Sequence, residues 1–386
     1  MKINLFEAFS GIWSQHRALE NIWFKVNSVW ISDWYVDAII AYWVEYLWIK
    51  WKKIDRAETI NFLKWFSLSR DSKKPLKTFW WINDEKLSIL EQVIKKFWKL
   101  DIRDIQWEDL IDKEIDLFTY SFPCQDISQQ WKRAGFSKWE KSRSWLLWEI
   151  ERILQEMKEL DPNKLPKILM MENVKAILNK EFKPDLDSWI EELSKLWYKT
   201  TQPFQVNSAD VWSPQNRTRV FMVSKLTPPT QPSPLQEEGV LEEFPKQKNN
   251  KQAKISDILQ KDQNREKLDK SKYSWYKTNI SKKETSVKKW ILEWYTTFNS
   301  ENYIYHKDWL SPTITASWAQ SRIKFIWDDW EIYFLNSLEH LLLQWFDKNF
   351  YEKLKKLDFT ETKIKFLAWN SINVKVLEKI FAFYLK

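Results

Sequence analysis

The first 225 residues alternate between short apolar runs and amphipathic segments, and this rhythm limits the fold more than any other feature of the sequence. The apolar runs of strand length lie at residues 3–9, 28–31, 115–120, 167–171 and 219–224. The amphipathic helices expected beside them lie at residues 15–21, 36–46, 144–159 and 187–196. Strands that alternate with helices form βαβ units. The sequence therefore predicts an α/β fold with a doubly wound, mainly parallel sheet.

The alternation ends after Lys225. A proline-rich stretch begins at Thr227, and a polar, lysine-rich stretch follows at residues 246–289, which suits either a solvated surface or a surface that faces a polyanion. Strand-like pieces return between Tyr295 and Phe334, and an amphipathic helix is expected at the end of the sequence, at 373–384. We predict a discontinuous large domain, residues 1–225 and 346–386, with a smaller module of residues 226–345 inserted before its last helix.

Charge and composition exclude several classes of protein. The formal net charge of +8 comes from 61 Lys+Arg against 53 Asp+Glu, which suits a polyanionic partner and equally an ordinary soluble surface. No stretch approaches the roughly 18 apolar residues of a membrane span, and the N-terminus has no signal-peptide pattern. The single cysteine excludes an internal disulfide, and three separated histidines argue against a zinc site. We expect a cytoplasmic protein that binds no metal and no membrane.

Tryptophan stands where turns need glycine. At the usual frequency of about 7%, a chain of this length holds about 27 glycines. This chain has 3, together with 28 tryptophans. Trp212-Ser213-Pro214 and Trp369-Asn370-Ser371 are examples of contexts in which the backbone asks for glycine. We predict that the gene encodes glycine by UGA codons that are translated here as tryptophan. The alternative is a naturally tryptophan-rich protein.

The single cysteine follows a strand. Ser121-Phe122-Pro123-Cys124-Gln125 comes directly after the apolar run 115–120. Cys124 is therefore expected at the carboxyl end of a sheet strand, where ligands bind in open α/β folds. A thiol in such a polar loop favours a reactive nucleophile. An isolated cysteine can instead be a small buried hydrophobic residue.

Polar groups border two further strands. Glu172-Asn173 closes the run 167–171, where a carboxylate can act as acid, base or hydrogen-bond acceptor, or cap the next helix. Arg217 and Arg219 lie two residues apart, on one side of an extended chain. Such a pair suits phosphate or carbonyl contacts, and a surface salt bridge is the alternative.

The first strand ends in Phe9-Ser10-Gly11-Ile12-Trp13, directly before a helix. With glycine at position 13, this loop lets a nucleotide-like cofactor approach the backbone at a helix N-terminus. Asp33 and Trp34 end the second strand, where an acid can hold a ribose hydroxyl and an indole can stack on adenine. Each of them also fits an ordinary turn or core position.

Together these segments resemble the cytosine-C5 DNA methyltransferase family, in the same order and at similar spacing over nearly the whole chain. The family's nucleophile loop corresponds to Pro123-Cys124-Gln125, its acidic motif to Glu172-Asn173-Val174, and its Gln-x-Arg-x-Arg motif begins at Gln215. The resemblance implies the sheet of the S-adenosylmethionine-dependent methyltransferases. It assigns catalysis to Cys124, Glu172, Arg217 and Arg219.

The resemblance also implies a site for S-adenosylmethionine and a set of DNA contacts. The cofactor residues would be Phe9, Gly11, Trp13, Asp33, Trp34, Asp101, Pro123, Asn370 and Ser371, with Trp34 and Asp101 at the adenine. The stretch 312–324 is most similar to bacterial CpG-type methylases. The DNA-contacting residues would be Gln125, Gln215, Thr313, Thr315, Ser317 and Arg322.

What the resemblance implies is methyl transfer from S-adenosylmethionine to carbon 5 of a flipped cytosine in double-stranded DNA, through a covalent Cys124 adduct. We expect a monomer in which residues 1–225 catalyse, 226–345 recognise the target and 346–386 return to the catalytic domain. A restriction-modification setting with a partner endonuclease and an orphan methylase are both open. The alternatives are a cytosine methyltransferase that acts on tRNA and, if the tryptophans are genuine, a catalytically dead DNA-binding protein.

Two departures from the family pattern stand out. Tryptophan replaces a family glycine at Trp13, Trp131, Trp139, Trp145, Trp197, Trp212, Trp318, Trp345 and Trp369. Trp34 and Trp148, by contrast, fall where tryptophan is ordinary. The second departure is Tyr333, six residues before Glu339, where the family usually has an arginine that supports the recognition domain. The packing of that domain is therefore in question.

Overall fold

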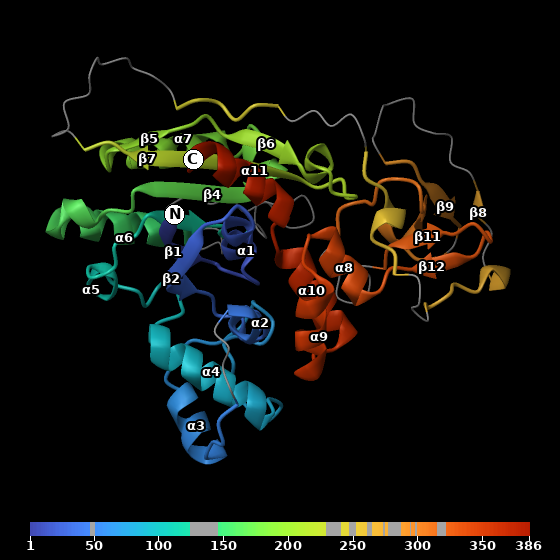
Figure 1. Cartoon of the computed structure of the whole chain (residues 1–386), viewed down its shortest axis with the longest axis horizontal. Coiled ribbons are helices and arrows are strands. Elements are labelled where there is room, and N and C mark those ends of the chain that lie inside the picture. The colour runs from blue at the N-terminus through green and yellow to red at the C-terminus, as the bar shows by residue number, and fades with distance from the viewer. Residues whose placement is uncertain are drawn as a thin grey trace. The chain divides into compact units, whose positions relative to one another are not determined.

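A computed structural model describes most of the chain. The described residues are 1–46, 51–123, 146–228, 241–246, 252–260, 265–272, 275–276, 287–293, 295–297, 299–314 and 322–386. Contacts divide the chain into two compact units: unit 1 consists of residues 1–206, 218–246 and 380–386, and unit 2 of residues 207–217 and 247–379 (Figure 1). By contacts, residues 346–379 group with unit 2, whereas the functional boundaries expected at 225 and 345 stay a prediction.

Unit 1 is built on a seven-stranded sheet. Its strands are β1 (Lys2–Ala8), β2 (Lys25–Ser32), β3 (Leu117–Tyr120), β4 (Ile168–Val174), β5 (Tyr198–Thr200), β6 (Phe204–Asn207) and β7 (Thr218–Leu226). Their order is β2-β1-β3-β4-β7-β5, with β6 also paired to β7. Strands β1 to β4 pair in parallel, whereas β7 runs antiparallel to β4 and β5 antiparallel to β7. The α/β fold with a mainly parallel sheet is confirmed.

Helices accompany this sheet in unit 1. They are α1 (Ser14–Asn21), α2 (Val36–Tyr46), α3 (Arg56–Leu63), α4 (Asp84–Phe97), α5 (Trp107–Leu110), α6 (Leu147–Leu160) and α7 (Lys183–Lys195). Helix α4 begins where the Asn83 side chain accepts a hydrogen bond from the Lys86 amide, and it buries Leu87, Leu90 and Ile94 on one face. It packs on α2 and α3, below the sheet in Figure 1. The sequence analysis did not anticipate α3 and α4.

The centre of the sheet is dry and aromatic. Phe6 on β1 and Phe118 on β3 are fully buried, and their rings stack with centroids 4.2 Å apart. Continuous apolar runs such as these are typical of strands that are covered on both faces. Several polar side chains of the sheet, among them Glu7, Ser32 and Glu172, lie near the carboxyl ends of their strands.

Residues near the end of the sequence complete unit 1. Helix α11 (Val374–Tyr384) carries Tyr384, whose hydroxyl donates to the carbonyl oxygen of Glu242 at 3.0 Å. Its ring stacks with Phe244, and the ring of Phe204 lies 5.2 Å from that of Phe244. Aromatic packing thus joins segments of unit 1 that are far apart in the sequence.

Unit 2 contains a five-stranded sheet of order β12-β11-β10-β9-β8. The strands are β8 (Trp275–Tyr276), β9 (Trp290–Leu292), β10 (Tyr303–His306), β11 (Lys324–Ile326) and β12 (Ile332–Phe334). The helices are α8 (Ser337–Leu343), α9 (Lys348–Lys356) and α10 (Glu361–Asn370). The sheet has an apolar core of its own, to which Leu292, Ile304 and Ile326 contribute fully buried side chains. Unit 2 therefore has a hydrophobic core that is separate from the core of unit 1.

Tryptophan dominates the left-handed backbone positions. Ten described residues other than glycine have a positive φ, and seven of these are tryptophans. The seven are Trp13, Trp23, Trp98, Trp197, Trp212, Trp330 and Trp345. A residue with a Cβ costs about 1–2 kcal/mol in this region, whereas glycine adopts it freely. The backbone therefore supports the hypothesis that these positions are glycines, which the codons of the gene would test.

The backbone gives less support for glycine at the other tryptophans that the sequence predicts to be glycine. Trp369 lies inside α10 and is not among the residues of positive φ. Trp131, Trp139, Trp145 and Trp318 lie outside the described residues. Neither Trp34 nor Trp148 has a positive φ, and Trp148 packs edge-on against Trp189 in the core. Ordinary tryptophan thus has ordinary backbone geometry here.

Candidate active site

Hydrogen bonds join the carboxyl ends of neighbouring strands β2 and β1. The Ser10 amide donates to the carbonyl oxygen of Ser32 at 3.0 Å. The Gly11 amide donates to Oδ2 of Asp33, also at 3.0 Å. The loop after β1 is thereby held against the end of β2, so two of the predicted cofactor segments are next to each other.

Two more bonds extend this row of strand ends across β3 to β4. The Ser121 hydroxyl after β3 donates to the carbonyl oxygen of Phe9 at 3.3 Å. The Asn173 side-chain amide donates to the carbonyl oxygen of Phe122 at 3.2 Å. The segment that enters the predicted nucleophile loop is therefore tied to the cofactor loop on one side and to the acidic motif on the other. Cys124 and Gln125 themselves lie outside the described residues.

The loop after β1 has room for a ligand at its backbone. Gly11 has φ +54°, and a Cβ built on it would meet no atom within 4 Å. Helix α1 follows without a side-chain cap. Its first amides therefore lack the capping oxygen that most helices carry, which suits a polar ligand. The Trp13 indole is buried and packs edge-on against Tyr46 of α2 at 4.7 Å.

The carboxylate of Asp33 is desolvated and hydrogen-bonded to backbone amides. It accepts from the amides of Gly11 and Tyr35, at 3.0 and 2.8 Å. Desolvation raises its pKa to about 6, and the negative charge of Asp101 adds to the shift while the backbone hydrogen bonds oppose it. Asp33 and Asp101 therefore form an electronegative pair that suits hydroxyl and amine donors. Gly11's open space and these acceptors fit the ribose and adenine of S-adenosylmethionine.

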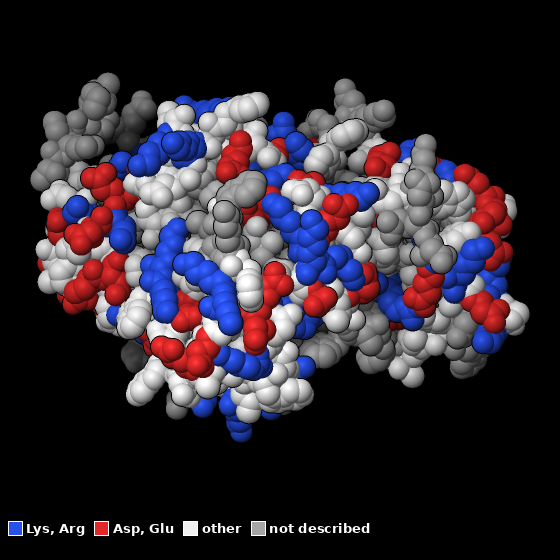
Figure 2. Space-filling view, turned by 60° about the horizontal axis from the view of Figure 1, so that its bottom comes forward, with Lys and Arg blue, Asp and Glu red and all other residues white. Residues whose placement is uncertain are grey.

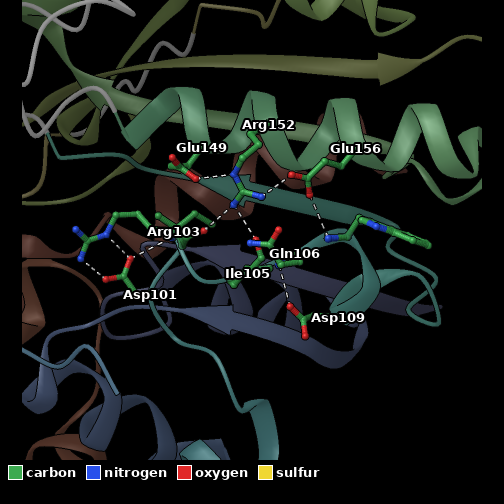
Figure 3. A network of polar contacts seen from close by, with 10 residues as sticks. Asp101, Arg103, Ile105, Gln106, Asp109, Glu149, Arg152 and Glu156 are labelled. Atoms are coloured by element: carbon green, nitrogen blue, oxygen red, sulfur yellow. Dashed lines mark hydrogen bonds and ion pairs between the residues drawn. The ribbon is translucent and has the colours of Figure 1, made fainter. Parts of the chain in front are cut away.

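Asp101 is buried beside an arginine that the sequence analysis did not single out. Its carboxylate accepts from the Arg103 amide and from Nε of the same residue, at 3.1 and 2.9 Å, and pairs with Nη2 as well. The Arg103 guanidinium also lies over the ring of Trp34, 5.8 Å from its centre. Three residues at this edge of unit 1 thus form one group, and Figure 3 shows the carboxylate and guanidinium facing each other. The Asp-x-Arg spacing was the signal that could have identified Arg103.

Glu172 and Arg219 face each other across β4 and β7. Arg219 Nε lies 3.3 Å from Glu172 Oε1, and both side chains keep some exposure, 15% for the arginine and 10% for the glutamate. The arginine also donates to the carbonyl oxygen of Thr218 at 2.9 Å. A carboxylate held in place by an arginine, yet still in reach of solvent, can hydrogen-bond a substrate.

The other residues of the Gln-x-Arg-x-Arg motif belong to unit 2. Arg217 is buried, and its Nη2 donates to the carbonyl oxygens of Trp369 and Ser371, at 2.9 Å each. Gln215 is fully buried, and its Oε1 accepts from the side chain of Gln344 at 3.0 Å. Both side chains are engaged inside unit 2, so their predicted roles at the flipped base and the DNA stay predictions.

Asn370 and Ser371, the last predicted cofactor residues, stand at the end of α10 in unit 2. Asn370 is exposed, whereas Ser371 is buried and donates through its hydroxyl to the carbonyl oxygen of Ala368 at 2.8 Å. The Arg217 contacts with this turn fix its backbone. Pro123 is the last described residue of the nucleophile segment in unit 1.

Only part of the predicted recognition set is described. The Thr313 hydroxyl donates to the carbonyl oxygen of Asn216, and the Arg322 guanidinium pairs with Glu266 and lies over the ring of Phe334. Thr315 and Ser317 lie outside the described residues. The buried Lys324 donates to the carbonyl oxygen of Arg322 at 3.3 Å, and burial lowers its pKa to about 8. The assignment of these residues to DNA stays a prediction.

At the position of Tyr333 the family usually has an arginine, and in this structure Arg265 forms a buried ion pair in unit 2. Its guanidinium pairs with Glu339 in the interior of unit 2, where the two side chains are 5% and 0% exposed. It also donates to the carbonyl oxygen of Gln260 at 2.9 Å. Tyr333 instead bonds Asp329 on the surface. Because Arg265 is 74 residues before its partner and lies in a polar stretch, no local pattern could have identified it.

Surface charge alone does not reveal the site. On the face shown in Figure 2, Lys and Arg are interspersed with acidic residues and do not form a field of one sign. Among the described residues, no group of three or more His, Cys, Asp or Glu side chains could hold a metal ion. The same part of the chain contains no helix long and apolar enough to cross a membrane.

Comparisons with known proteins agree with this geometry. Residues 79–385 match the family model of the C-5 cytosine-specific DNA methylases. The chain is 37% identical over 391 residues to the orphan methyltransferase M.SssI of Spiroplasma monobiae, covering 98% of this chain and 96% of that protein. It is 34% identical over 234 residues to the type II methyltransferase M2.ScrFI of Lactococcus lactis subsp. cremoris, covering 58% of this chain and 62% of that one.

Solved structures show the same fold. The Dnmt2 methyltransferase of S. pombe superimposes with a TM-score of 0.59 at 16% identity, over 99% of this chain and 98% of that one. The Entamoeba histolytica methyltransferase EhMeth gives 0.58 at 16% identity, with the same coverage. The chain therefore belongs to the C-5 cytosine-specific DNA methylase family and is a DNA (cytosine-5-)-methyltransferase that uses S-adenosylmethionine.

Proposed function

We propose that the protein methylates carbon 5 of a flipped cytosine in double-stranded DNA through a covalent adduct with Cys124. The observation that carries this proposal is the Asn173–Phe122 hydrogen bond of 3.2 Å. It ties the chain two residues before Cys124 to the residue next to Glu172, so the thiol and the carboxylate would act on one base. Target atoms inside a duplex are out of reach, so the cytosine must leave the stack.

The cytosine ring is electron-poor, so its carbon 5 must be made nucleophilic before it can take a methyl group. The Cys124 thiolate would form a bond to carbon 6, while the Glu172 carboxyl group, protonated, would donate to N3 and accept from the exocyclic amine, which stabilises the charge pushed into the ring. Bound S-adenosylmethionine would supply an electrophilic methyl group, and S-adenosylhomocysteine would be left when the bond between that methyl group and the sulfonium sulfur breaks. Loss of the carbon 5 proton to water would then return its electron pair to the ring as the bond between carbon 6 and the Cys124 sulfur breaks, which restores the thiolate. Arg219 holds Glu172 in place, and Arg217 and Arg219 would hold the carbonyl oxygen of the base.

The cofactor site that we propose follows the row of strand ends in unit 1. Phe9, Gly11 and position 13 would form the loop at its backbone, Asp33 would hold the ribose, and Trp34 and Asp101 would hold the adenine. Pro123, Asn370 and Ser371 are assigned by resemblance. The space at Gly11 and the two acids support this assignment.

DNA recognition is assigned to the inserted module, residues 226–345. The proposed DNA contacts within it are Thr313, Thr315, Ser317 and Arg322, and Gln125 and Gln215 are proposed contacts outside it. Base-edge contacts give discrimination of about 1–3 kcal/mol each, whereas phosphate contacts give affinity alone. Exchanging the module for that of a related enzyme should move the methylated sites, which bisulfite sequencing reports. We also propose a cytoplasmic monomer; a restriction-modification setting is supported only by the type II relatives.

The decisive experiment uses the chain translated with UGA as glycine, called the glycine-decoded chain below. Cys124→Ser should abolish methyl transfer to duplex DNA and leave S-adenosylhomocysteine binding unchanged. Duplex DNA with 5-fluorocytosine should trap the unsubstituted protein covalently, because the fluorine cannot leave as the proton does. Full turnover by the serine variant would remove Cys124 from the mechanism, and trapping by tRNA but not by duplex DNA would favour the RNA substrate.

A further inference from the structure

The buried carboxylate of Asp101 is organised by one neighbour, Arg103. Two groups of Arg103, its amide and Nε, donate to Oδ1 of Asp101, and Nη2 pairs with Oδ2. The carboxylate is 6% exposed and the guanidinium 46% exposed. Each carboxylate oxygen accepts about two hydrogen bonds. Oδ1 is thus filled by Arg103, whereas Oδ2 keeps capacity for a further donor.

The same guanidinium lies against Trp34. Its carbon is 5.8 Å from the centre of the indole ring, which is within the range of a cation–π contact. Arg103 therefore contacts both residues that the proposed function places at the adenine. It is the side chain in the described structure that joins them.

The turn that carries Asp101 is also held by contacts that do not involve Arg103. Arg152 of α6 donates to the carbonyl oxygens of Ile102 and Ile105, at 3.4 and 2.7 Å, and pairs with Glu149 and Glu156 (Figure 3). The clamp by Arg152 holds the backbone from the side of α6. The Arg103–Asp101 pair is half-open, because the Arg103 side chain is 46% exposed whereas the Asp101 side chain is 6% exposed.

We propose that Arg103 is a positioning residue that makes Asp101 select a 6-aminopurine. The arginine holds the carboxylate turned so that the remaining acceptor site on Oδ2 faces the amino group of the cofactor's base. A 6-oxopurine would present an oxygen there and meet an acceptor. This proposal rests on the proposed assignment of Trp34 and Asp101 to the adenine.

The test measures binding of two ligands by calorimetry, S-adenosylhomocysteine and its 6-oxo counterpart S-inosylhomocysteine, in the glycine-decoded chain. The unsubstituted protein should prefer the adenosyl ligand. Arg103→Met should weaken the adenosyl ligand about tenfold, the loss of one charge-assisted hydrogen bond, and leave the inosyl ligand within about twofold. Arg103→Lys should keep part of the preference. Arg56→Met is the matched control, because Arg56 pairs with Asp84 and donates to main-chain carbonyls on the surface of unit 1.

The possible outcomes distinguish a failure of the role proposed for Arg103 from a failure of the proposed cofactor site. Equal weakening of both ligands in Arg103→Met, or tighter adenosyl binding, would overturn the role of Arg103 alone. No preference in the unsubstituted protein would overturn the Asp101 assignment and this proposal with it, and no binding of either ligand would overturn the cofactor site. The double variant Arg103→Met/Asp101→Asn should bind the adenosyl ligand no more weakly than Asp101→Asn, and an additive loss would contradict the proposal even if Arg103→Met reduced stability.

Discussion

Two glutamate–arginine pairs, one in each unit, show how the same chemistry serves different ends. In unit 1, Glu172 and Arg219 approach to 3.3 Å and both remain partly exposed. In unit 2, Glu339 and Arg265 are enclosed, and the glutamate also accepts from the amides of Gln260 and Asn336 at 3.2 and 3.0 Å. The Glu172 pair, the open pair, remains partly exposed to solvent, whereas the Glu339 pair, the closed pair, is enclosed and also bonded to backbone amides of its own unit. Solvent exposure, more than residue type, distinguishes the pair that we propose to be catalytic from the structural one.

The closed pair should give the largest effect. Arg265→Met leaves Glu339 buried without its cation, which costs about 3–5 kcal/mol. Unit 2 should therefore unfold at lower temperature in differential scanning calorimetry, while S-adenosylhomocysteine binding to unit 1 persists below that transition. Arg322→Met is the control, because its pair with Glu266 is far more exposed and its loss should cost under about 1 kcal/mol. Equal losses in the two variants would remove the distinction between closed and open pairs.

The open pair should show the reverse pattern. Glu172→Gln should slow methyl transfer by about 10²–10³-fold, the effect of losing one group that stabilises developing charge. Its melting temperature should change little. Asp116→Asn serves as the control, since Asp116 directly precedes β3 and pairs with Lys167, which directly precedes β4. A tritium-transfer assay measures the turnover of both variants, and thermal unfolding measures their melting temperatures. A Glu172→Gln variant that lost stability but kept its turnover would contradict the catalytic role of Glu172.

Glu7 shows a third way to bury a carboxylate, without an arginine. It lies fully buried on β1, where it accepts from the Tyr42 hydroxyl at 2.6 Å, and desolvation raises its pKa to about 8. The folded protein thus keeps this proton up to about pH 8, whereas the unfolded chain releases it near 4.5. Between these values the free energy of unfolding falls as pH rises, by up to about 1.4 kcal/mol per pH unit.

Glu7→Gln removes this dependence. The free energy of unfolding of the variant, relative to the unsubstituted protein, should increase between about pH 5 and pH 8 by a few kcal/mol in chemical denaturation. Glu58→Gln, on the exposed side of α3, should give a difference that does not change with pH. If the Glu7→Gln difference were equally flat, protonation would not be the way this acid is accommodated.

Glycine replacements should give the smallest effects, and similar ones in both units. Trp197→Gly in unit 1 and Trp212→Gly in unit 2 relieve a left-handed backbone and should each stabilise by about 1 kcal/mol. Trp148→Gly is the control, because removing a buried ordinary tryptophan costs about 3–5 kcal/mol. The gene should carry UGA at Trp13, Trp131, Trp212 and Trp369 and UGG at Trp34 and Trp148. UGG at the first four would contradict the glycine hypothesis.

The sequence predicted the elements that have a simple period, and it predicted little that depends on distant partners. Helix α2 spans 36–46 as expected, and β1 differs from its expected range by one residue at each end. The reversed direction of β7 escaped prediction, because a buried strand has the same apolar pattern in both directions. Arg265 escaped because its partner is far away in sequence, and the hydrogen bond from Asn173 to Phe122 because only the fold brings them together.

The path of the chain through unit 1 has a consequence for how the protein is made. The aromatic layer of Phe204, Phe244 and Tyr384 forms only after residues 247–379 have been synthesised. At about 5–20 residues per second, a ribosome needs on the order of ten seconds for that insertion. During this time the nascent unit 1 lacks a closing aromatic layer and exposes apolar surface to chaperones. A chain that lacked residues 380–386 would thus keep the residues that we propose to be catalytic but lose the aromatic packing that Tyr384 contributes to unit 1.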